Sequence, residues 1–132
     1  MLRSSLVLAA LLALGGCVKY VGVSAKNFRP ATRPEGIWSD LRFRHGRLSG
    51  ELLEAADSGL FVLANDKVVF VPLGVIRSGV FAERGTLIYN GRADERAREE
   101  LRLLSRFPAG LSRERRTLLL AAYGQTEPEV AR

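Results

Sequence analysis

The stretch 47-RLSGELLEAADSGLFVLANDKVVFVPL-73 decides the fold class of this 132-residue chain. Its segments rich in Leu, Val and Phe are 47–55, 60–64 and 67–73. In the first segment apolar and polar residues alternate, which is the period of a half-buried strand. Asp57-Ser58-Gly59 is a turn sequence, and Asn65-Asp66 is typical of a tight hairpin. The stretch therefore predicts three consecutive β-strands.

The third of these segments is apolar on both sides. Val68 and Phe70 share one face of the predicted strand, and Val69 and Val71 share the other. Such a strand is typical of the centre of a closed or strongly coiled sheet. Pro72 has no N–H to donate, so we expect strand pairing to end there.

Two further short strands are predicted at 79–83 and 86–90. Five short strands joined by tight turns close most simply into a small barrel, which has no exposed edge. The order of features in this region resembles that of the small SH3-like and Sm-like barrels. The features are Gly50-Glu51-Leu52, an Asp turn, an apolar strand that ends at Pro72, and then Ile76. The resemblance covers about 40 residues and implies a five-stranded antiparallel barrel.

A short helix is predicted before the barrel, at 33–44. Thr32 and Glu35 have the spacing of a capping box. The apolar residues that would share one face of this helix are Ile37, Trp38 and Leu41. Gly36 and the alternation of apolar residues after it leave a strand as the alternative for this segment.

After residue 92 the hydrophobic period changes to that of a helix. Ala97, Leu101 and Leu104 fall on one face of the first predicted helix. Ser112 is placed to cap a second helix, which ends at Gly124. The sequence therefore predicts an α+β domain over 33–124, with a C-terminal helical hairpin packed on the barrel and a loose tail at 125–132.

The first residues have the layout of an export signal. Arg3 precedes a run at 6–14 that holds only Leu, Val and Ala. A membrane span needs about 20 apolar residues, so this run is too short to cross a bilayer. We therefore expect residues 1–16 to be a cleaved signal peptide.

Leu14-Gly15-Gly16-Cys17 directly follows that run and resembles the lipobox of bacterial lipoproteins. The resemblance implies that Leu14, Gly15 and Gly16 are read by the signal peptidase. It also implies that Cys17, the only cysteine, carries a diacylglyceryl group and an N-linked acyl chain such as palmitate. An ordinary signal peptidase requires a small residue at position −3, but a cut before Cys17 would place the large Leu14 there. This disfavours that enzyme. An ordinary signal peptide followed by a free thiol, or a buried apolar start, is the alternative.

Residues 17–32 are expected to tether the domain to its lipid anchor. At most about 3.6 Å per residue, this segment reaches roughly 55 Å. Tyr20, Val21 and Val23 offer a short edge strand as the alternative. Two or three acyl chains attach a protein stably, since each buried methylene contributes about 0.8 kcal/mol.

The expected location is the cell envelope, on a membrane that faces the periplasm. The outer membrane is the favoured one, and the inner membrane is the alternative.

The chain is basic, with a formal net charge of +6 that falls to +5 when Arg3 leaves with the signal. An exported basic protein does not normally meet nucleic acid, so none is expected as a partner; anionic lipid or glycan surfaces are available. Arginines and acids interleave along much of the chain, which favours a solvated surface of mixed charge. One cysteine allows no intramolecular disulfide, so the apolar core must stabilise the fold.

Catalysis requires convergent titratable groups, and the sequence offers few. His45 is the only histidine, and Ser39 and Asp40 are the candidates that would complete a hydrolytic triad with it. Metal-ligand spacing and phosphate-binding glycine motifs are absent from the sequence. We therefore predict no enzyme activity, no metal and no cofactor other than the lipid on Cys17.

Two groups of residues are candidates for binding. Arg113, Arg115 and Arg116 form the densest basic cluster and are a possible surface for an anionic ligand or a partner. The aromatic residues that core packing or a ligand groove would use are Trp38, Phe61, Phe70, Phe81 and Tyr89.

The functional hypothesis is a membrane-anchored envelope lipoprotein that acts as a non-catalytic interaction or structural module, with another envelope protein as its partner. The alternative is a binding module for an anionic envelope ligand such as peptidoglycan, lipopolysaccharide or phospholipid head groups. Sm-like RNA binding would follow from the barrel but conflicts with export.

Overall fold

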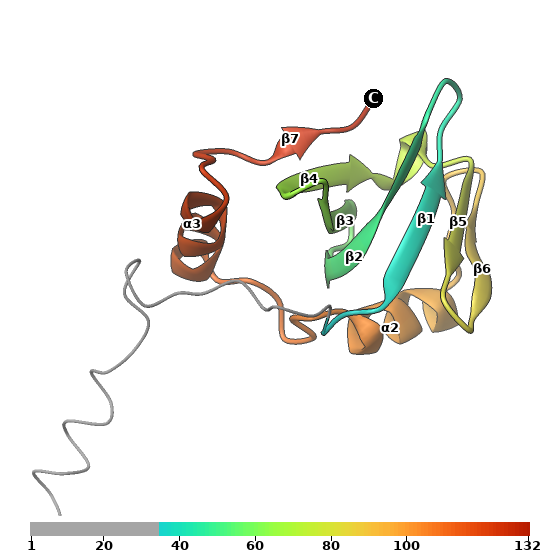
Figure 1. Ribbon diagram of the computed structural model, residues 1–132. Coiled ribbons are helices and arrows are strands. Elements are labelled where there is room, and N and C mark those ends of the chain that lie inside the picture. The colour runs from blue at the N-terminus through green and yellow to red at the C-terminus, as the bar shows by residue number, and fades with distance from the viewer. Residues whose placement is uncertain (1–34) are drawn as a thin grey trace, which may run out of the picture.

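Residues 35–132, which the computed structural model describes, form one sheet of seven strands with two α-helices packed against it (Figure 1). The strands are β1 (Trp38–Arg42), β2 (Arg47–Ala55), β3 (Gly59–Ala64), β4 (Lys67–Pro72), β5 (Ser78–Phe81), β6 (Gly85–Tyr89) and β7 (Glu129–Val130). The helices are the 3₁₀-helix η1 (Leu73–Val75), α2 (Glu95–Leu104) and α3 (Arg113–Ala122). The strand order is β6-β5-β1-β2-β3-β4-β7, and every neighbouring pair is antiparallel except β4 with β7.

The predicted five-stranded SH3-like or Sm-like barrel is wrong, because the sheet has seven strands and is not closed. β7 occupies the outer edge of β4 with Val69 opposite Glu129, so β4 does not pair with the far end of the sheet. This strand lies in the segment 125–132 that the sequence predicted as a loose tail. The side chain of Gln125 fastens the segment by accepting from the Val68 N–H at 2.8 Å and donating to the Val68 carbonyl at 3.1 Å.

The predicted N-terminal helix at 33–44 is also wrong, because this segment forms β1. Ser39 and Leu41 are buried while Trp38 and Arg42 are exposed, which is the alternation of a strand. β1 pairs with β2 on one side and β5 on the other, and these backbone bonds stabilise the extended form. Thr32, the other half of the expected capping box, lies outside the described residues.

The tight hairpin at 65–66 and the existence of two C-terminal helices are confirmed. The predicted helical hairpin is wrong, because α2 packs on one hydrophobic core and α3 packs on another (Figure 1). Asn65 and Asp66 have φ angles of 52° and 59°, as a two-residue hairpin turn with the twist of its strands requires. The Ser112 hydroxyl accepts from the N–H of Arg115 at 3.2 Å and caps α3 as expected. At the start of α2, the Asp94 carboxylate accepts from the N–H of Ala97 at 2.7 Å.

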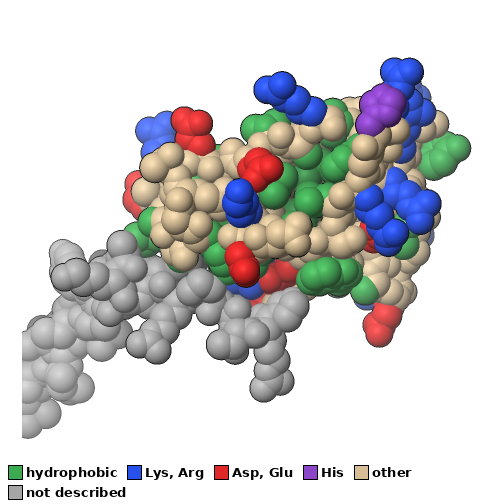
Figure 2. Space-filling view, turned by 45° about the horizontal axis from the view of Figure 1, so that its top comes forward, with side chains coloured by type: hydrophobic (Ala, Val, Ile, Leu, Met, Phe, Trp, Pro, Cys, Tyr) green, Lys and Arg blue, Asp and Glu red, His purple; other side chains and the backbone are tan. Residues whose placement is uncertain are grey.

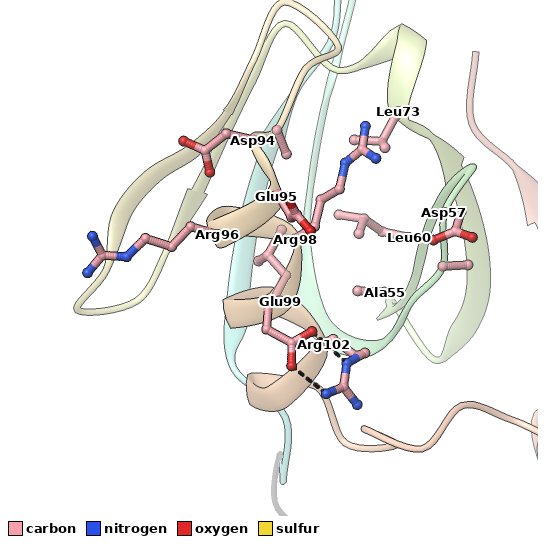
Figure 3. A pocket seen from close by; sticks show the side chains of 13 residues that line it. Ala55, Asp57, Leu60, Leu73, Asp94, Glu95, Arg96, Arg98, Glu99 and Arg102 are labelled. Carbon is pink, nitrogen blue, oxygen red and sulfur yellow. Dashed lines mark hydrogen bonds and ion pairs between the residues drawn. The ribbon is translucent and has the colours of Figure 1, made fainter.

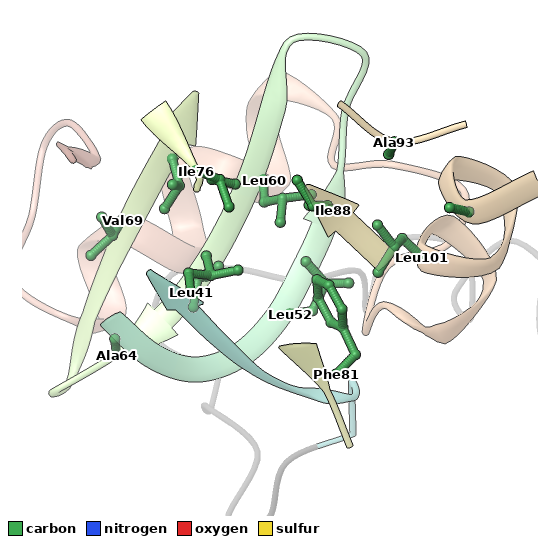
Figure 4. Close-up of a cluster of buried hydrophobic side chains, with 13 residues drawn as sticks. Leu41, Leu52, Leu60, Ala64, Val69, Ile76, Phe81, Ile88, Ala93 and Leu101 are labelled. Carbon is green, nitrogen blue, oxygen red and sulfur yellow. The ribbon is translucent and has the colours of Figure 1, made fainter. Parts of the chain in front are cut away.

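Apolar side chains cover both faces of β3 and β4. Val69 and Val71 belong to a larger core that α2 helps to close (Figure 4). Val68 and Phe70 face the opposite way and pack in a second core beneath α3. The predicted assignment of these four residues to two faces is therefore confirmed, although the covering layer on one face is a helix and not the wall of a barrel.

An irregularity in β2 decides where its acidic side chains point. Glu51 lies opposite Leu63 and Glu54 lies opposite Phe61, with a β-bulge between Leu52 and Glu54. Leu63 and Phe61 are two residues apart and share one face, so both carboxylates lie on that face. A regular strand would have put these two side chains, three residues apart, on opposite faces.

A buried ion pair between Glu51 and Arg106 ties together three parts of the chain. Both side chains are at least 95% buried, and two hydrogen bonds join them, of which Arg106 Nε to Glu51 Oε2 measures 2.7 Å. The same Oε2 accepts from the N–H groups of Glu35 at 2.9 Å and Gly36 at 2.7 Å. Burial by itself would lower the pKa of Arg106, but the hydrogen bonds and charge of Glu51 outweigh it and raise the pKa. The guanidinium therefore stays charged inside the fold.

Backbone bonds run beside this pair and leave no room for a side chain at Gly36. The N–H groups of Arg106 and Phe107 donate to the carbonyls of Leu52 at 3.0 Å and Leu53 at 2.9 Å. A Cβ on Gly36 would lie 2.1 Å from the Leu52 carbonyl oxygen, which no rotamer change can relieve.

We predict that Arg106→Met lowers the free energy of unfolding by about 3–5 kcal/mol, because it leaves the Glu51 carboxylate buried without its charged partner. Urea denaturation of the purified protein measures this change. Arg98→Met is the matched control: Arg98 is exposed, so its loss should change the free energy by under about 1 kcal/mol. Equal losses in the two variants would contradict the structural role of the buried pair.

We predict that Phe81→Ala lowers the free energy of unfolding by about 3–5 kcal/mol, because Phe81 is 1% exposed within the larger core. Tyr89→Ala is the comparison, since Tyr89 is 67% exposed and its loss should stay within about 0.5 kcal/mol. Chemical denaturation at constant pH distinguishes the two. A small effect at Phe81 would mean that the inward face of β5 has been assigned wrongly.

Candidate functional site

A pocket of about 850 Å³ lies between α2, the β2–β3 turn and η1 (Figure 3). Its apolar lining includes Leu60, Leu73, Ala93 and Leu101, which come from four different parts of the chain. Leu60 and Leu101 are only 2% exposed, so the pocket floor is also part of the larger core.

Charged side chains from α2 form the rim of the pocket. Arg102 donates through Nε to Glu99 at 3.0 Å and through Nη2 at 2.5 Å, and its Nη1 donates to the Pro108 carbonyl at 2.9 Å. The hydrogen bonds between Arg102 and Glu99 raise the pKa of Arg102 and lower the pKa of Glu99. In Figure 3, Arg98 extends across the pocket towards Leu73. The rim thus holds one arginine–carboxylate pair and one arginine directed over apolar side chains.

The structure separates the three arginines that the sequence singled out on α3. Arg113 and Arg115 are exposed in the first turn. Arg116 turns back to the sheet, where its guanidinium lies 4.5 Å from the ring centroid of Phe61 and its Nη2 lies 3.4 Å from Glu54 Oε2. A cation over an aromatic face and beside a carboxylate is a packing contact. Arg116 therefore holds α3 on the sheet, and only Arg113 and Arg115 offer their charge to solvent.

The residues of the candidate triad point in different directions. The buried Ser39 hydroxyl donates to the Gly50 carbonyl at 2.8 Å. On the other face of β1, the Asp40 carboxylate accepts from Arg47 and from the Ser49 hydroxyl. His45 is exposed in the β1–β2 turn. The serine and the aspartate are thus engaged with other groups, and the geometry of a triad is not formed.

The five aromatic candidates divide between core and surface. Phe81 is buried in the larger core, while Phe61 and Phe70 pack in the second core with ring centroids 4.9 Å apart. Trp38 and Tyr89 are 49% and 67% exposed. The structure therefore brings no groove together from all five.

The sequence analysis missed a cluster of basic residues that we call the basic end: Arg42, Arg44, His45, Arg47, Arg77 and Arg92. All six are exposed. The motif 42-RFRHGR-47 could have drawn attention to four of them, because it holds three arginines and a histidine with no acid. Arg77 and Arg92 join them only through strand pairing, which no local motif indicates.

In residues 35–132, no group of three His, Cys, Asp or Glu side chains is arranged to hold a metal ion. No helix within those residues has the length and apolar character needed to span a membrane. The proposed lipidation site, Cys17, and the peptidase residues Leu14, Gly15 and Gly16 lie outside the described part of the chain.

Comparison of the chain with protein-family models, with curated proteins and with solved structures gave no match.

We predict that the stabilising effect of Asp40 is lost in acid. The hydrogen bond from Arg47 holds the pKa of Asp40 below its ordinary value of 3.8, against a smaller opposing effect of burial. The carboxylate therefore stabilises the fold fully above about pH 3.8, and this contribution disappears as the pH falls through the lowered pKa of the folded state. Asp40→Asn should have a lower urea midpoint than the parent at pH 7, and the two midpoints should converge below pH 3.8.

Asp57→Asn serves as the control, because Asp57 is exposed and forms no ion pair among residues 35–132. Its urea midpoint should follow that of the parent at every pH. A gap between Asp40→Asn and the parent that stays constant into acid would show that the lost contact is not ionic.

Proposed function

We propose that this chain is a membrane-anchored lipoprotein of the bacterial cell envelope whose folded domain is a non-catalytic interaction module. The observation that carries the proposal is Leu14-Gly15-Gly16-Cys17, placed directly after a short apolar run that itself follows Arg3. The position, the apolar run and the four-residue pattern agree with one another.

The state of the acidic residues supports a non-catalytic role. Glu51 and Glu54 share a face of β2, where two carboxylates could act together as acid and base. Each is instead bonded to an arginine from the C-terminal half of the chain, Glu51 to Arg106 and Glu54 to Arg116. In both cases the arginine is used to hold the C-terminal segments on the sheet.

A second candidate function is the binding of an anionic envelope ligand. The observation that favours it is a set of exposed arginines, namely Arg113 and Arg115 on α3 and the arginines of the basic end. Only Arg47 among them has a carboxylate of residues 35–132 within 4.0 Å. Exposed arginines without acidic neighbours attract phosphate and carboxylate groups of a ligand. Sm-like RNA binding is not retained, because the barrel on which it depended is not present.

We expect mass spectrometry of the mature protein to find acyl groups on an N-terminal Cys17, with residues 1–16 removed. In Cys17→Ser the acyl groups should be missing and the protein should move from the membrane fraction to the soluble fraction. The folded domain is the internal control: Cys17→Ser should unfold at the same urea concentration as the parent. An unmodified Cys17, or a mature N-terminus at another residue, would refute the lipoprotein proposal.

A further inference from the structure

We propose that the basic end is a second membrane contact, at which the domain binds the head groups of anionic phospholipids. The inference rests on the proposed function, because a lipid-anchored domain stays within reach of a bilayer surface. It adds to that function a definite face of the domain and a definite ligand chemistry.

Strand pairing assembles the basic end from three places in the sequence. Arg42 lies opposite Arg47 in the β1–β2 ladder. The N–H of Arg77 donates to the Arg42 carbonyl at 2.7 Å, and the Arg77 carbonyl accepts from Asn90 at 2.8 Å. Arg92 joins the same end through its bridge with Tyr89. The arginines therefore project from adjacent, hydrogen-bonded ends of the sheet.

The charge of this end is not neutralised within the described domain. Asp40 pairs with Arg47, but no carboxylate of residues 35–132 lies within 4.0 Å of Arg42, Arg44, Arg77 or Arg92. Figure 2 shows Lys and Arg side chains gathered around the single histidine at one end of the molecule. By contrast, Arg84, Arg102, Arg106 and Arg116 each meet an acid elsewhere on the fold. Four arginines without a carboxylate partner therefore gather at one end of the sheet, while the other unpaired arginines of residues 35–132 are divided among α2, α3 and the C-terminal residue.

The shape and composition of the basic end favour a bilayer over a small soluble anion. None of its arginines lines the pocket beside α2; they stand on a hairpin turn and on strand ends. Tyr89, 67% exposed, lies in the row of Arg42 and Ser78. A tyrosine beside arginines suits the boundary between head groups and acyl chains, where the ring meets apolar groups and the hydroxyl meets water.

The test uses the mature chain, residues 17–132, carrying Cys17→Ser, so that no acyl group contributes to binding. Its affinity is measured by co-sedimentation with vesicles of equimolar phosphatidylglycerol and phosphatidylcholine, and with vesicles of phosphatidylcholine alone. We expect binding only to the anionic vesicles, with an affinity that falls as salt is added. Equal binding to both kinds of vesicle, or binding to neither, would overturn the proposal.

The decisive variant is Arg42→Gln/Arg44→Gln/Arg77→Gln in the same chain. Each arginine near an anionic surface contributes about a fivefold gain in affinity, so the triple variant should bind on the order of 100-fold more weakly. All three side chains are exposed, and the urea midpoint should match that of the parent.

The matched control is Lys67→Gln/Arg84→Gln/Arg132→Gln, which removes the same charge from exposed positions outside the basic end, the pocket and α3. Its vesicle binding should stay close to that of the parent, and an equal loss would mean that net charge alone matters. Binding of the parent to polyglutamate but not to vesicles would assign the basic end to an acidic protein and overturn the proposal. The acylation of Cys17 is measured separately by mass spectrometry, so failure of one proposal is distinguishable from failure of the other.

Discussion

The buried pair of Glu51 and Arg106 is the constraint on which the rest of the structure depends. A carboxylate at the middle of β2 has lost its water, and it is compensated by one guanidinium and by the N–H groups of Glu35 and Gly36. These contacts hold the residues that precede β1 and the residues that follow α2 at the same place on β2. The adjacent backbone bonds from Arg106 and Phe107 to β2 extend the contact along the strand. Because a buried charge without its partner costs several kcal/mol, these three segments must fold together.

The bulge in β2 gives that strand a second role. It brings Glu54 to the same face as Glu51, where Arg116 reaches it from α3 while also lying over Phe61. One strand therefore receives an arginine from each of the two C-terminal segments. The second core under α3 forms around these contacts, with Leu53, Phe61 and Leu119 in its interior. The ion pairs of Glu51 and Glu54 thus hold the two C-terminal segments on the sheet.

Four of the arginines without a carboxylate partner lie together at the basic end, and the proposed second membrane contact rests on them. A domain held near a bilayer by flexible acyl chains can turn freely unless a second contact orients it. The proposed contact at the basic end would act mainly through electrostatic attraction, which reaches across the head-group layer and weakens with salt. Under that proposal, an oriented domain would present the other end of β1, with the exposed Trp38, away from the bilayer.

The sequence by itself determined the local elements: the alternation at Val68–Val71, the turn at Asn65-Asp66 and the caps of α2 and α3 depend on neighbours a few residues away. It also contains Leu14-Gly15-Gly16-Cys17, a linear motif that resembles a lipobox. Tertiary structure alone decided that residues 38–42 are a central strand, since their backbone bonds go to residues distant in sequence. The same holds for the pairing of β7 with β4, the burial of Arg106, and the use of Arg116 inside the fold. Long-range pairing places Arg42, Arg77 and Arg92 at one end, which explains why a search for local charge density selected Arg113, Arg115 and Arg116 instead.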